Sequence, residues 1–304
     1  MKVVIVGMGI QGIKRKFFLG KDFVYSVDKF KKADFKSIID VPINKFDSVF
    51  ICVPDEEKIK IINYCIEKKK NILVEKPLLS KNNKILKSLE RSANKNKIVC
   101  YTSYNHRFEP IIIKLQKLIK SKKLGKIYKC KIFYGNGTSL LVKKSNWRDK
   151  QLGVISDIGS HLIDLCLFWF GKKIKKLKLV QVNKFENKAP DHATLMLEIN
   201  KIKIELEMTL CMWKNTFNCD VIASKGSAHL NSLSKWDKNT FCVRKRKLPS
   251  GKPYEKTITY KKGDPTWKDE YLFFKNLVKK KSKTNLENNL ILNEKFIKLK
   301  KFTY

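Results

Sequence analysis

The sequence predicts an α/β protein with two domains, the first built on a doubly wound parallel sheet and the second on a largely antiparallel sheet. The first third of the chain alternates short apolar runs with helical segments, as βαβ units with a parallel sheet do. The last third carries successive strand-like segments in which apolar and polar residues alternate, as in antiparallel sheets with one solvated face. The length of 304 residues suits two domains of ordinary size.

The chain opens with a nucleotide-binding pattern. Residues 2–6 form an apolar run typical of a buried parallel strand. The glycines at 7, 9 and 12 follow directly and lead into a helical segment, 13–19. Glycines at this spacing allow a tight turn and let the backbone approach a pyrophosphate at the helix N-terminus. A strand, a glycine loop and a helix in this order predict dinucleotide binding.

Asp28 is the predicted determinant of cofactor choice. It ends a second strand, 23–27, about 20 residues beyond the first glycine, where a carboxylate holds the two ribose hydroxyls of NAD and repels a 2′-phosphate. We therefore expect NAD, with NADP possible because Lys29 stands beside the carboxylate. The alternative is that Asp28 only caps the loop.

The rest of the first domain continues the alternation. We expect strands at 47–53, 71–74 and 98–101 and helices at 57–68 and 82–94. Lys76 follows the strand 71–74 and precedes a proline, so it lies at the carboxyl end of a parallel strand, where ligands of such sheets gather. The boundary is placed near Ser103, which gives domains 1–103 and 104–304.

The second domain begins with a mixed segment and then becomes strand-rich. We expect a helix at 110–120, a strand at 127–134, a loop at 135–150 and a buried helix at 153–171. Strands are then expected at 174–185, 192–199, 202–210, 217–223, 241–248 and 254–260, and helices at 267–280 and 290–300.

The helix 153–171 carries three ionisable residues although it is otherwise apolar. Asp157, His161 and Asp164 are three or four positions apart and therefore share one helical face. Burying such groups is costly unless they are paired or used. One interpretation is a structural His–Asp pair, and the other is a catalytic group in which His161 transfers a proton and Asp157 orients its imidazole.

The net charge of +38 first suggests a nucleic-acid surface. Only six of the 66 basic residues are Arg, however, and the lysines are spread through every segment. Nucleic-acid readers favour Arg for bidentate contacts. We interpret the excess as drift under an A/T-rich codon bias and expect no nucleic-acid partner, with attraction of anionic substrates as a lesser alternative.

Cysteine usage and hydropathy indicate that the protein is located in a reducing compartment, without a membrane span. The eight cysteines form no Cys-x-x-Cys pair, and most stand in apolar surroundings, as core residues of a reducing compartment do. We expect no metal site. No signal peptide and no apolar run long enough to span a bilayer is present, so we expect a soluble cytoplasmic protein without a membrane partner.

Taken together, these motifs resemble the glucose–fructose oxidoreductase, inositol dehydrogenase and MocA family over nearly the full length. The resemblance rests on the glycine fingerprint, on Glu75-Lys76-Pro77, on Asn105-His106-Arg107-Phe108, on Trp147-Arg148 and on the Asp-x-Gly-x-His-x-x-Asp run from Asp157 to Asp164. It implies a Rossmann domain, a second α/β domain with an open, largely antiparallel sheet, and dimers or tetramers. It also implies NAD or NADP and a sugar or polyol substrate.

The resemblance further implies site residues. The implied catalytic residues are Lys76, Asp157 and His161. The implied cofactor contacts are Gly7, Gly9, Ile10, Gln11, Gly12, Asp28, Val53, Pro54, Glu75 and Lys76. The expected substrate contacts are Lys76, Asn105, Arg107, Trp147, Arg148, Asp157 and His161. Lys58 stands where the family usually has a histidine, and only Gly153 remains of the glycines that often precede the Asp-x-Gly-x-His run.

The expected activity is hydride transfer between the nicotinamide and a hydroxyl-bearing carbon, with His161 or Lys76 exchanging the hydroxyl proton. Lysine suits this role if burial and the cationic ring lower its pKa. Two alternatives stay open on the same fold. One is a glycosidase that uses bound NAD in a transient oxidation, and the other is a non-catalytic regulator that senses sugar and NAD.

Overall fold

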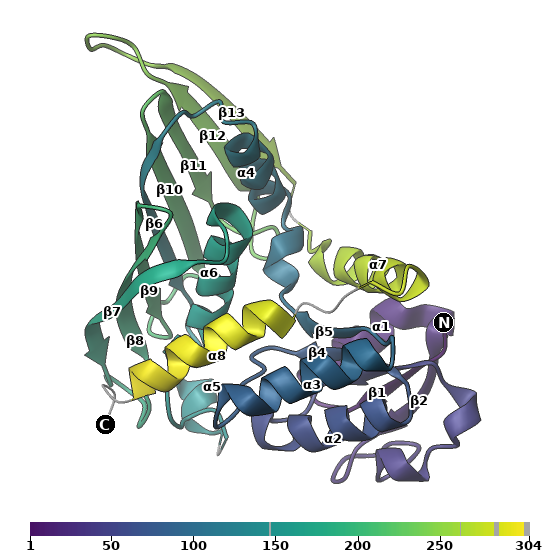
Figure 1. Ribbon diagram of the computed structural model, residues 1–304. Helices are drawn as coiled ribbons and strands as arrows, with labels where there is room; N and C mark the ends of the chain where they lie inside the picture. The colour runs from purple at the N-terminus through teal and green to yellow at the C-terminus, as the bar shows by residue number, and fades with distance from the viewer. Residues whose placement is uncertain (146, 262, 283–285, 301–304) are drawn as a thin grey trace. The chain divides into compact units, whose positions relative to one another are not determined.

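The chain folds as two compact units in the computed structural model, which describes residues 1–145, 147–261, 263–282 and 286–300 (Figure 1). The first unit contains Met1–Asn105 and Trp267–Ile297, and the second contains His106–Thr266 and the residues from Lys298 onward. The first break lies two residues beyond the predicted boundary near Ser103. The second break, at the C-terminal helices, is absent from the predicted division into 1–103 and 104–304.

A five-stranded parallel sheet forms the centre of the first unit. Its strands are β1 (Val3–Val6), β2 (Phe23–Val27), β3 (Ser48–Ile51), β4 (Asn71–Glu75) and β5 (Cys100–Ser103). They run in the order β2-β1-β3-β4-β5, and every neighbouring pair is parallel. The direction of winding reverses beside β1, and ligands of open parallel sheets bind beyond the strand ends at such a switch point.

Helices cover both faces of this sheet, so its strands are buried on both sides. Val4 and Val6 of β1 join one core with residues of α2 (Asp55–Glu67) and α3 (Asn83–Lys95). The alternate residues Val3 and Ile5 join a second core with α1 (Ile10–Leu19) and α7 (Thr266–Lys279). The predicted doubly wound parallel sheet is therefore confirmed.

The C-terminal helices fold largely with the first unit because their apolar and amide side chains complete it. Tyr271 and Phe274 of α7 are buried with Val3 and Ile5. From α8 (Leu286–Lys300), Asn289 Nδ2 donates to Thr102 Oγ1 at 2.5 Å. These long-range contacts explain why a boundary read along the chain assigned both helices to the second domain.

The second unit is built on an eight-stranded open sheet. Its strands are β6 (Ile127–Gly135), β7 (Ile174–Asn183), β8 (His192–Ile199), β9 (Ile202–Thr209), β10 (Thr216–Ala223), β11 (Gly226–Asn231), β12 (Asn239–Lys245) and β13 (Tyr254–Tyr260). The order is β13-β12-β11-β10-β6-β9-β8-β7. Only the β6–β9 pair is parallel, so the predicted largely antiparallel sheet is confirmed.

Helices α4 (Pro110–Lys120) and α6 (Val154–Phe170) pack on one face of this sheet (Figure 1). Along β9, Ile204, Leu206 and Met208 are buried whereas the residues between them are not. Gly159 of α6 lies against Met208, since a Cβ there would stand 2.9 Å from the Met208 sulfur. The glycine thus allows the helix to approach the sheet closely.

The structure departs from the predicted elements in several places. Strand β11 was not predicted, because its run Gly-Ser-Ala-His-Leu-Asn is short and weakly apolar. Helix α5 (Ser139–Lys143) lies in the predicted loop 135–150, and α8 begins at Leu286 rather than at 290. Short 3₁₀ turns also occur at Gly20–Asp22, Ile38–Asp40, Ile43–Lys45 and Asn105–Phe108.

Candidate active site

The glycine loop after β1 has the tight geometry that its sequence predicts. Gly7 has φ of +97°, and a Cβ on it would stand 2.5 Å from the carbonyl oxygen of Cys52. A Cβ on Gly12 would stand 2.0 Å from the carbonyl oxygen of Gly7, so only glycine lets α1 pack onto the loop. A Cβ on Gly9, at the N-cap of α1, meets nothing within 4 Å. The helix N-terminus is therefore bordered by open space.

Asp28 braces this loop. Its Oδ2 accepts a hydrogen bond from the Met8 backbone N–H at 2.7 Å. Its Oδ1 accepts from the backbone N–H groups of Phe30 and Lys31 at 2.9 and 2.8 Å. Burial opposes ionisation, but these three hydrogen bonds hold the pKa of Asp28 below its ordinary value. The carboxylate is therefore ionised and fixed beside the loop, where it caps the turn.

The other predicted cofactor residues of the first unit surround the same strand ends. Ile10 and Gln11 are exposed in the first turn of α1. Val53 lies against Gly7, with its Cγ1 3.0 Å from the position of a Gly7 Cβ. Pro54 is exposed at the N-cap of α2.

Lys76 follows β4 as predicted and is half-buried before a cis peptide bond to Pro77. Lys58, from α2, hydrogen-bonds to Pro77, the residue that follows Lys76. Its ammonium donates to the Pro77 carbonyl oxygen and to Asp55 Oδ1, both at 2.7 Å. Lys58 is only 2% exposed. The residue that departs from the family pattern thus supports the turn that carries Lys76.

Glu75, a predicted cofactor contact, binds a buried arginine in the structure. Its Oε1 accepts from Arg15 Nε at 2.8 Å, and Glu270 Oε2 accepts from Arg15 Nη2 at 2.7 Å. Burial raises the pKa of Glu270, and the charge of Arg15 opposes that rise. This cluster ties α1, β4 and α7 together.

In the second unit, α6 pairs each of its two aspartates with an arginine. Asp157 Oδ2 accepts from Arg148 Nη2 at 2.9 Å, and both side chains are about one-third exposed. Asp164 is 1% exposed and forms a bidentate pair with Arg107, whose Nε donates to Oδ2 at 2.6 Å. Arg107 and Arg148 were expected to contact substrate, and the structure shows both engaged by carboxylates of this helix.

His161, from the middle of α6, stacks on a second histidine. The rings of His161 and His106 are nearly parallel, with centroids 4.0 Å apart and planes at 21°. His106 also stacks on Tyr134, with centroids 5.7 Å apart. Among the other predicted substrate residues, Asn105 is buried and Trp147 is exposed.

Lys235 completes this group and was not predicted. It lies in the turn between β11 and β12, with its Nζ 3.2 Å from Tyr134 Oη and 3.4 Å from His106 Nε2. Burial lowers the pKa of Lys235, while the charges of Asp264, Glu109 and Asp157 oppose that shift. No local signal singles it out among so many lysines. His106 lies inside the Asn-His-Arg-Phe motif. Its position next to Arg107 is the sequence feature from which it could have been predicted as a site residue.

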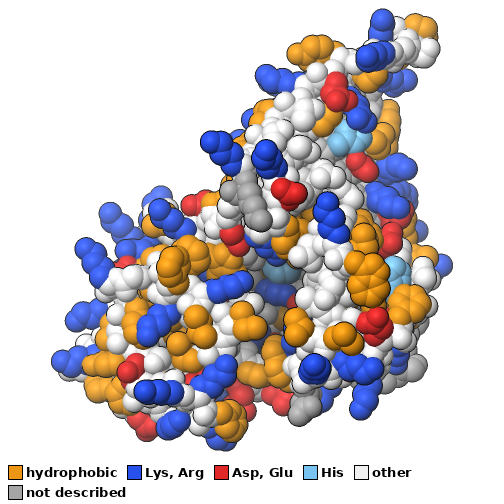
Figure 2. All heavy atoms as spheres, turned by 180° about the vertical axis from the view of Figure 1, so that it is seen from behind, with side chains coloured by type: hydrophobic (Ala, Val, Ile, Leu, Met, Phe, Trp, Pro, Cys, Tyr) orange, Lys and Arg blue, Asp and Glu red, His pale blue; other side chains and the backbone are white. Residues whose placement is uncertain are grey.

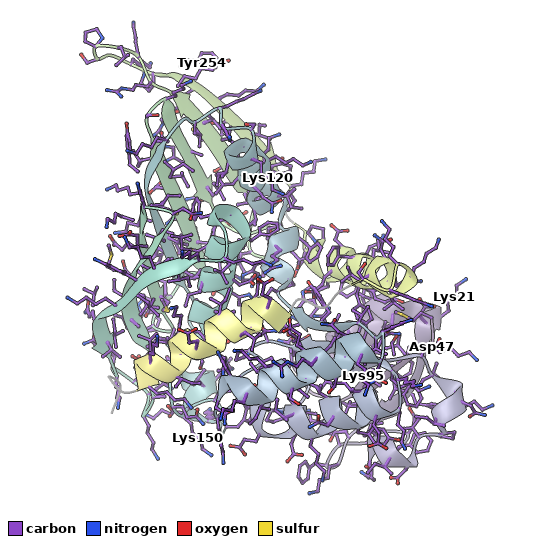
Figure 3. The ribbon with its side chains drawn as sticks, viewed as in Figure 1. Lys21, Asp47, Lys95, Lys120, Lys150 and Tyr254 are labelled. Atoms are coloured by element: carbon purple, nitrogen blue, oxygen red, sulfur yellow. The ribbon has the colours of Figure 1, made fainter. Side chains whose placement is uncertain are left out.

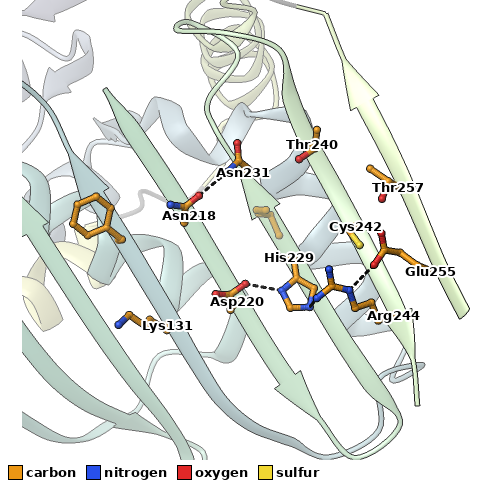
Figure 4. A pocket seen from close by; sticks show the side chains of 12 residues that line it. Lys131, Asn218, Asp220, His229, Asn231, Thr240, Cys242, Arg244, Glu255 and Thr257 are labelled. Carbon is orange, nitrogen blue, oxygen red and sulfur yellow. Dashed lines mark hydrogen bonds and ion pairs between the residues drawn. The ribbon is translucent and has the colours of Figure 1, made fainter. Parts of the chain in front are cut away.

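A separate hollow of about 460 Å³ lies on the other, solvated face of the sheet (Figure 4). His229 accounts for its polar centre, since Nδ1 lies 2.6 Å from Asp220 Oδ1 and Nε2 lies 2.7 Å from Ser227 Oγ. Arg244 beside it pairs with Glu255 at 2.5 Å. These side chains satisfy one another, as cross-strand pairs on a wet sheet face do.

Neither a metal site nor a membrane span is found within the ranges described above. There, no cluster of three or more His, Cys, Asp or Glu side chains is arranged to bind a metal ion. In the same ranges, no helix combines the length and apolarity that a bilayer crossing requires. The lysines and arginines are scattered over the face shown in Figure 2 and do not merge into one basic block.

The comparisons with known proteins agree with this architecture. Residues 112–229 match the family model described as GFO/IDH/MocA C-terminal domain. The predicted resemblance to this family is confirmed over these residues. The matched residues include β6 and α6, and therefore also Asp157 and His161.

Among curated proteins, the chain is similar to scyllo-inositol 2-dehydrogenase (NADP(+)) of Bacillus subtilis strain 168. The two are 25% identical over 142 residues, which are 46% of this chain and 39% of that protein. The chain thus spans about two fifths of the length of this relative.

Solved structures match nearly the whole chain. A levoglucosan dehydrogenase in complex with NADH has a TM-score of 0.81 at 17% identity, covering 99% of this chain and 96% of that one. An oxidoreductase from Agrobacterium radiobacter in complex with NAD+, L-tartaric acid and magnesium has a TM-score of 0.78 at 14% identity, covering 99% and 94%. At these identities the likeness shows the shared fold.

Proposed function

We propose that the protein is an NAD(P)-dependent oxidoreductase that transfers a hydride between the nicotinamide and a hydroxyl-bearing carbon of a sugar, polyol or sugar derivative. The observation that carries this proposal is the glycine loop. Gly7 and Gly12 leave no room for a side chain, Gly9 borders open space at the N-terminus of α1, and Asp28 is fixed beside them. That combination suits a pyrophosphate and an adjacent ribose.

The cofactor is proposed to be held by this chain as follows. The backbone of Gly9, Ile10 and Gln11 at the start of α1 would bind the pyrophosphate, because the first N–H groups of a helix have no partner within it. Asp28 would accept a hydrogen bond from a ribose hydroxyl and repel a 2′-phosphate, which favours NAD over NADP. When bound, the nicotinamide supplies the hydride acceptor or donor.

His161 is proposed as the group that exchanges the hydroxyl proton. As the carbinol carbon loses its hydride, the hydroxyl must lose a proton for the carbonyl to form. Histidine performs this exchange near neutral pH, and stacking on His106 fixes the plane of the His161 ring. Lys76 is proposed to hydrogen-bond the same substrate oxygen, which steadies its developing negative charge.

Asp157 is proposed to orient His161 from one helical turn earlier. Because Arg148 binds Asp157, that arginine would hold the carboxylate in place and would act through it. Asp164 is proposed to be structural, since Arg107 engages both of its oxygens. Assembly into a dimer or tetramer is proposed on the family resemblance, and a cytoplasmic location is proposed on the cysteine usage of the sequence.

The test is a screen for NADH and NADPH formation over sugars, polyols, uronic acids and nucleotide sugars. His161→Ala and Lys76→Ala should each lower turnover by about 10²–10⁴-fold, the contribution of a general acid–base group, while NAD still binds. His192→Ala and Lys95→Ala are matched controls from β8 and from the exposed end of α3 (Figure 3). Full turnover in His161→Ala would refute its role, and NAD-dependent sugar cleavage without NADH release would indicate a glycosidase.

A further inference from the structure

Lys235 places a positive charge close to His161, with only the His106 ring between them. Its ammonium lies 3.4 Å from His106 Nε2, and the His106 ring lies 4.0 Å from the His161 ring. The ammonium also lies 3.2 Å from Tyr134 Oη and 4.8 Å from the centre of the Trp236 ring. A lysine in this setting is directed inward, in contrast to the many solvated lysines of the chain.

The turn that carries Lys235 is fixed by a buried hydrogen-bond network. The Ser234 hydroxyl donates to Glu109 Oε2 at 2.5 Å and accepts from Asn239 Nδ2 at 2.7 Å. The Ser234 backbone N–H donates to the same Glu109 oxygen at 3.2 Å. Ser234, Glu109 and Asn239 are each at most 2% exposed. The position of the ammonium is therefore set before any ligand arrives, which lowers the entropy cost of binding.

Lys235 differs from Arg107 and Arg148, two other cations of the second unit, in its charge partner. Arg148 and Arg107 each pair with an aspartate of α6. Within the described part of the chain, no carboxylate oxygen lies within the 4.0 Å of an ion pair from Lys235 Nζ, and Lys235 is half-buried. Charges removed from water are normally paired. The charges of Asp264, Glu109 and Asp157 act on the ammonium from beyond that distance, so an anion from outside the chain would be its direct partner.

We propose that Lys235 binds an anionic group of the substrate, so that the substrate is a sugar acid or a phosphorylated sugar rather than a neutral polyol. Carboxylate and phosphate share the chemistry that an ammonium recognises, a charge-assisted hydrogen bond. With the carbinol at His161, the anion would lie on the His106 side of it. This inference rests on the proposed dehydrogenase function, because it names the substrate class of that site.

The test compares D-glucuronate, D-glucose 6-phosphate and D-glucose as substrates of the full chain. Lys235→Met should lower the ratio of kcat/KM for an anionic sugar over glucose by about 10–100-fold, the value of a charge-assisted hydrogen bond. The loss should lie mainly in KM, and Lys235→Arg should retain much of the ratio. Lys238→Met, an exposed lysine of the same turn, is the matched control and should leave the ratio unchanged. The two anionic sugars separate a carboxylate site from a phosphate site.

An unchanged ratio in Lys235→Met would overturn the proposal, as would an equal loss for glucose and the anionic sugars, which indicates a structural role. Calorimetric titration of the same sugars into wild type and Lys235→Met gives a readout that needs no turnover. If no sugar yields NADH but anionic sugars still bind through Lys235, the dehydrogenase function fails and the anion site stands. If sugars are turned over but anionic sugars are not preferred, the dehydrogenase function stands and the anion site fails.

Discussion

Asp28 and Asp164 show how the surroundings assign roles to the same side chain. Asp164 is almost fully buried and gives both oxygens to Arg107, so a ligand finds no free charge there. Asp28 is half-buried, and its partners are neutral backbone N–H groups. A carboxylate offers about four acceptor positions, and three hydrogen bonds leave capacity for one more donor. Asp28 is therefore suited to reading a ribose hydroxyl.

The residue-scale prediction concerns cofactor choice. Asp28→Asn removes the negative charge that repels a 2′-phosphate, and it should shift the NAD over NADP affinity ratio toward NADP by about tenfold or more. Titrating both cofactors into wild type and variant measures the ratio. Asp40→Asn, an exposed aspartate of the same unit, should leave it unchanged. Tighter binding of NADP than of NAD by the wild-type protein would contradict the assignment.

At the scale of elements, two helical glycines differ in the kind of atom that a side chain at their position would contact. A Cβ on Gly12 of α1 would stand 2.0 Å from a backbone carbonyl oxygen, that of Gly7. A Cβ on Gly159 of α6 would meet the Met208 sulfur at 2.9 Å, the far part of a flexible side chain. Backbone cannot retreat without disturbing β1, whereas a thioether can rotate away.

We therefore expect opposite outcomes for the two alanine substitutions. Gly12→Ala should destabilise the first unit strongly and abolish NAD binding, because α1 is forced away from the loop. Gly159→Ala should change the stability by at most about 1 kcal/mol, since alanine's better helix propensity offsets the small shift of Met208. Thermal unfolding and NAD titration of both variants check this. Equal destabilisation by the two would show that Met208 cannot move.

The elements that the sequence predicted well are those whose signal is local. The glycine loop and α6 depend on residues within one or two turns, so spacing alone indicated them. Strand β11 was missed because small residues such as Gly226 and Ala228 hide its alternation. The association of α7 with the first unit depends on contacts between residues such as Phe274 and Ile5, which no local pattern reveals.

The same reason limited the prediction of the candidate site. His161 was identified from its helical stripe with Asp157 and Asp164. Lys235 was not, because its importance comes only from the buried turn that brings it to His106. With 66 Lys and Arg in the chain, residue type alone carries almost no information about which cation has a function.

At the scale of the whole molecule, the net charge of +38 comes from lysines of two kinds, exposed ones and ones that other protein groups engage. Lys21, Lys95 and Lys120 come from three different elements (Figure 3), and all three are exposed. Lys58 and Lys235 by contrast are engaged by protein groups. Exposed charges separated by more than the screening length, about 8 Å at physiological salt, barely interact. Most of the excess is therefore expected to have no partner and no catalytic effect.

Lys21→Glu, Lys95→Glu and Lys120→Glu together should consequently leave turnover within about twofold of wild type, because salt screens exposed surface charges and they contribute little. Turnover is measured at low and at physiological salt with the substrate that the screen identifies. Retention of duplex DNA is measured beside it, since a protein that neutralises several phosphates binds with a steep salt dependence. A large loss of activity from these scattered changes, or salt-resistant DNA binding that they abolish, would reveal a true anionic partner surface.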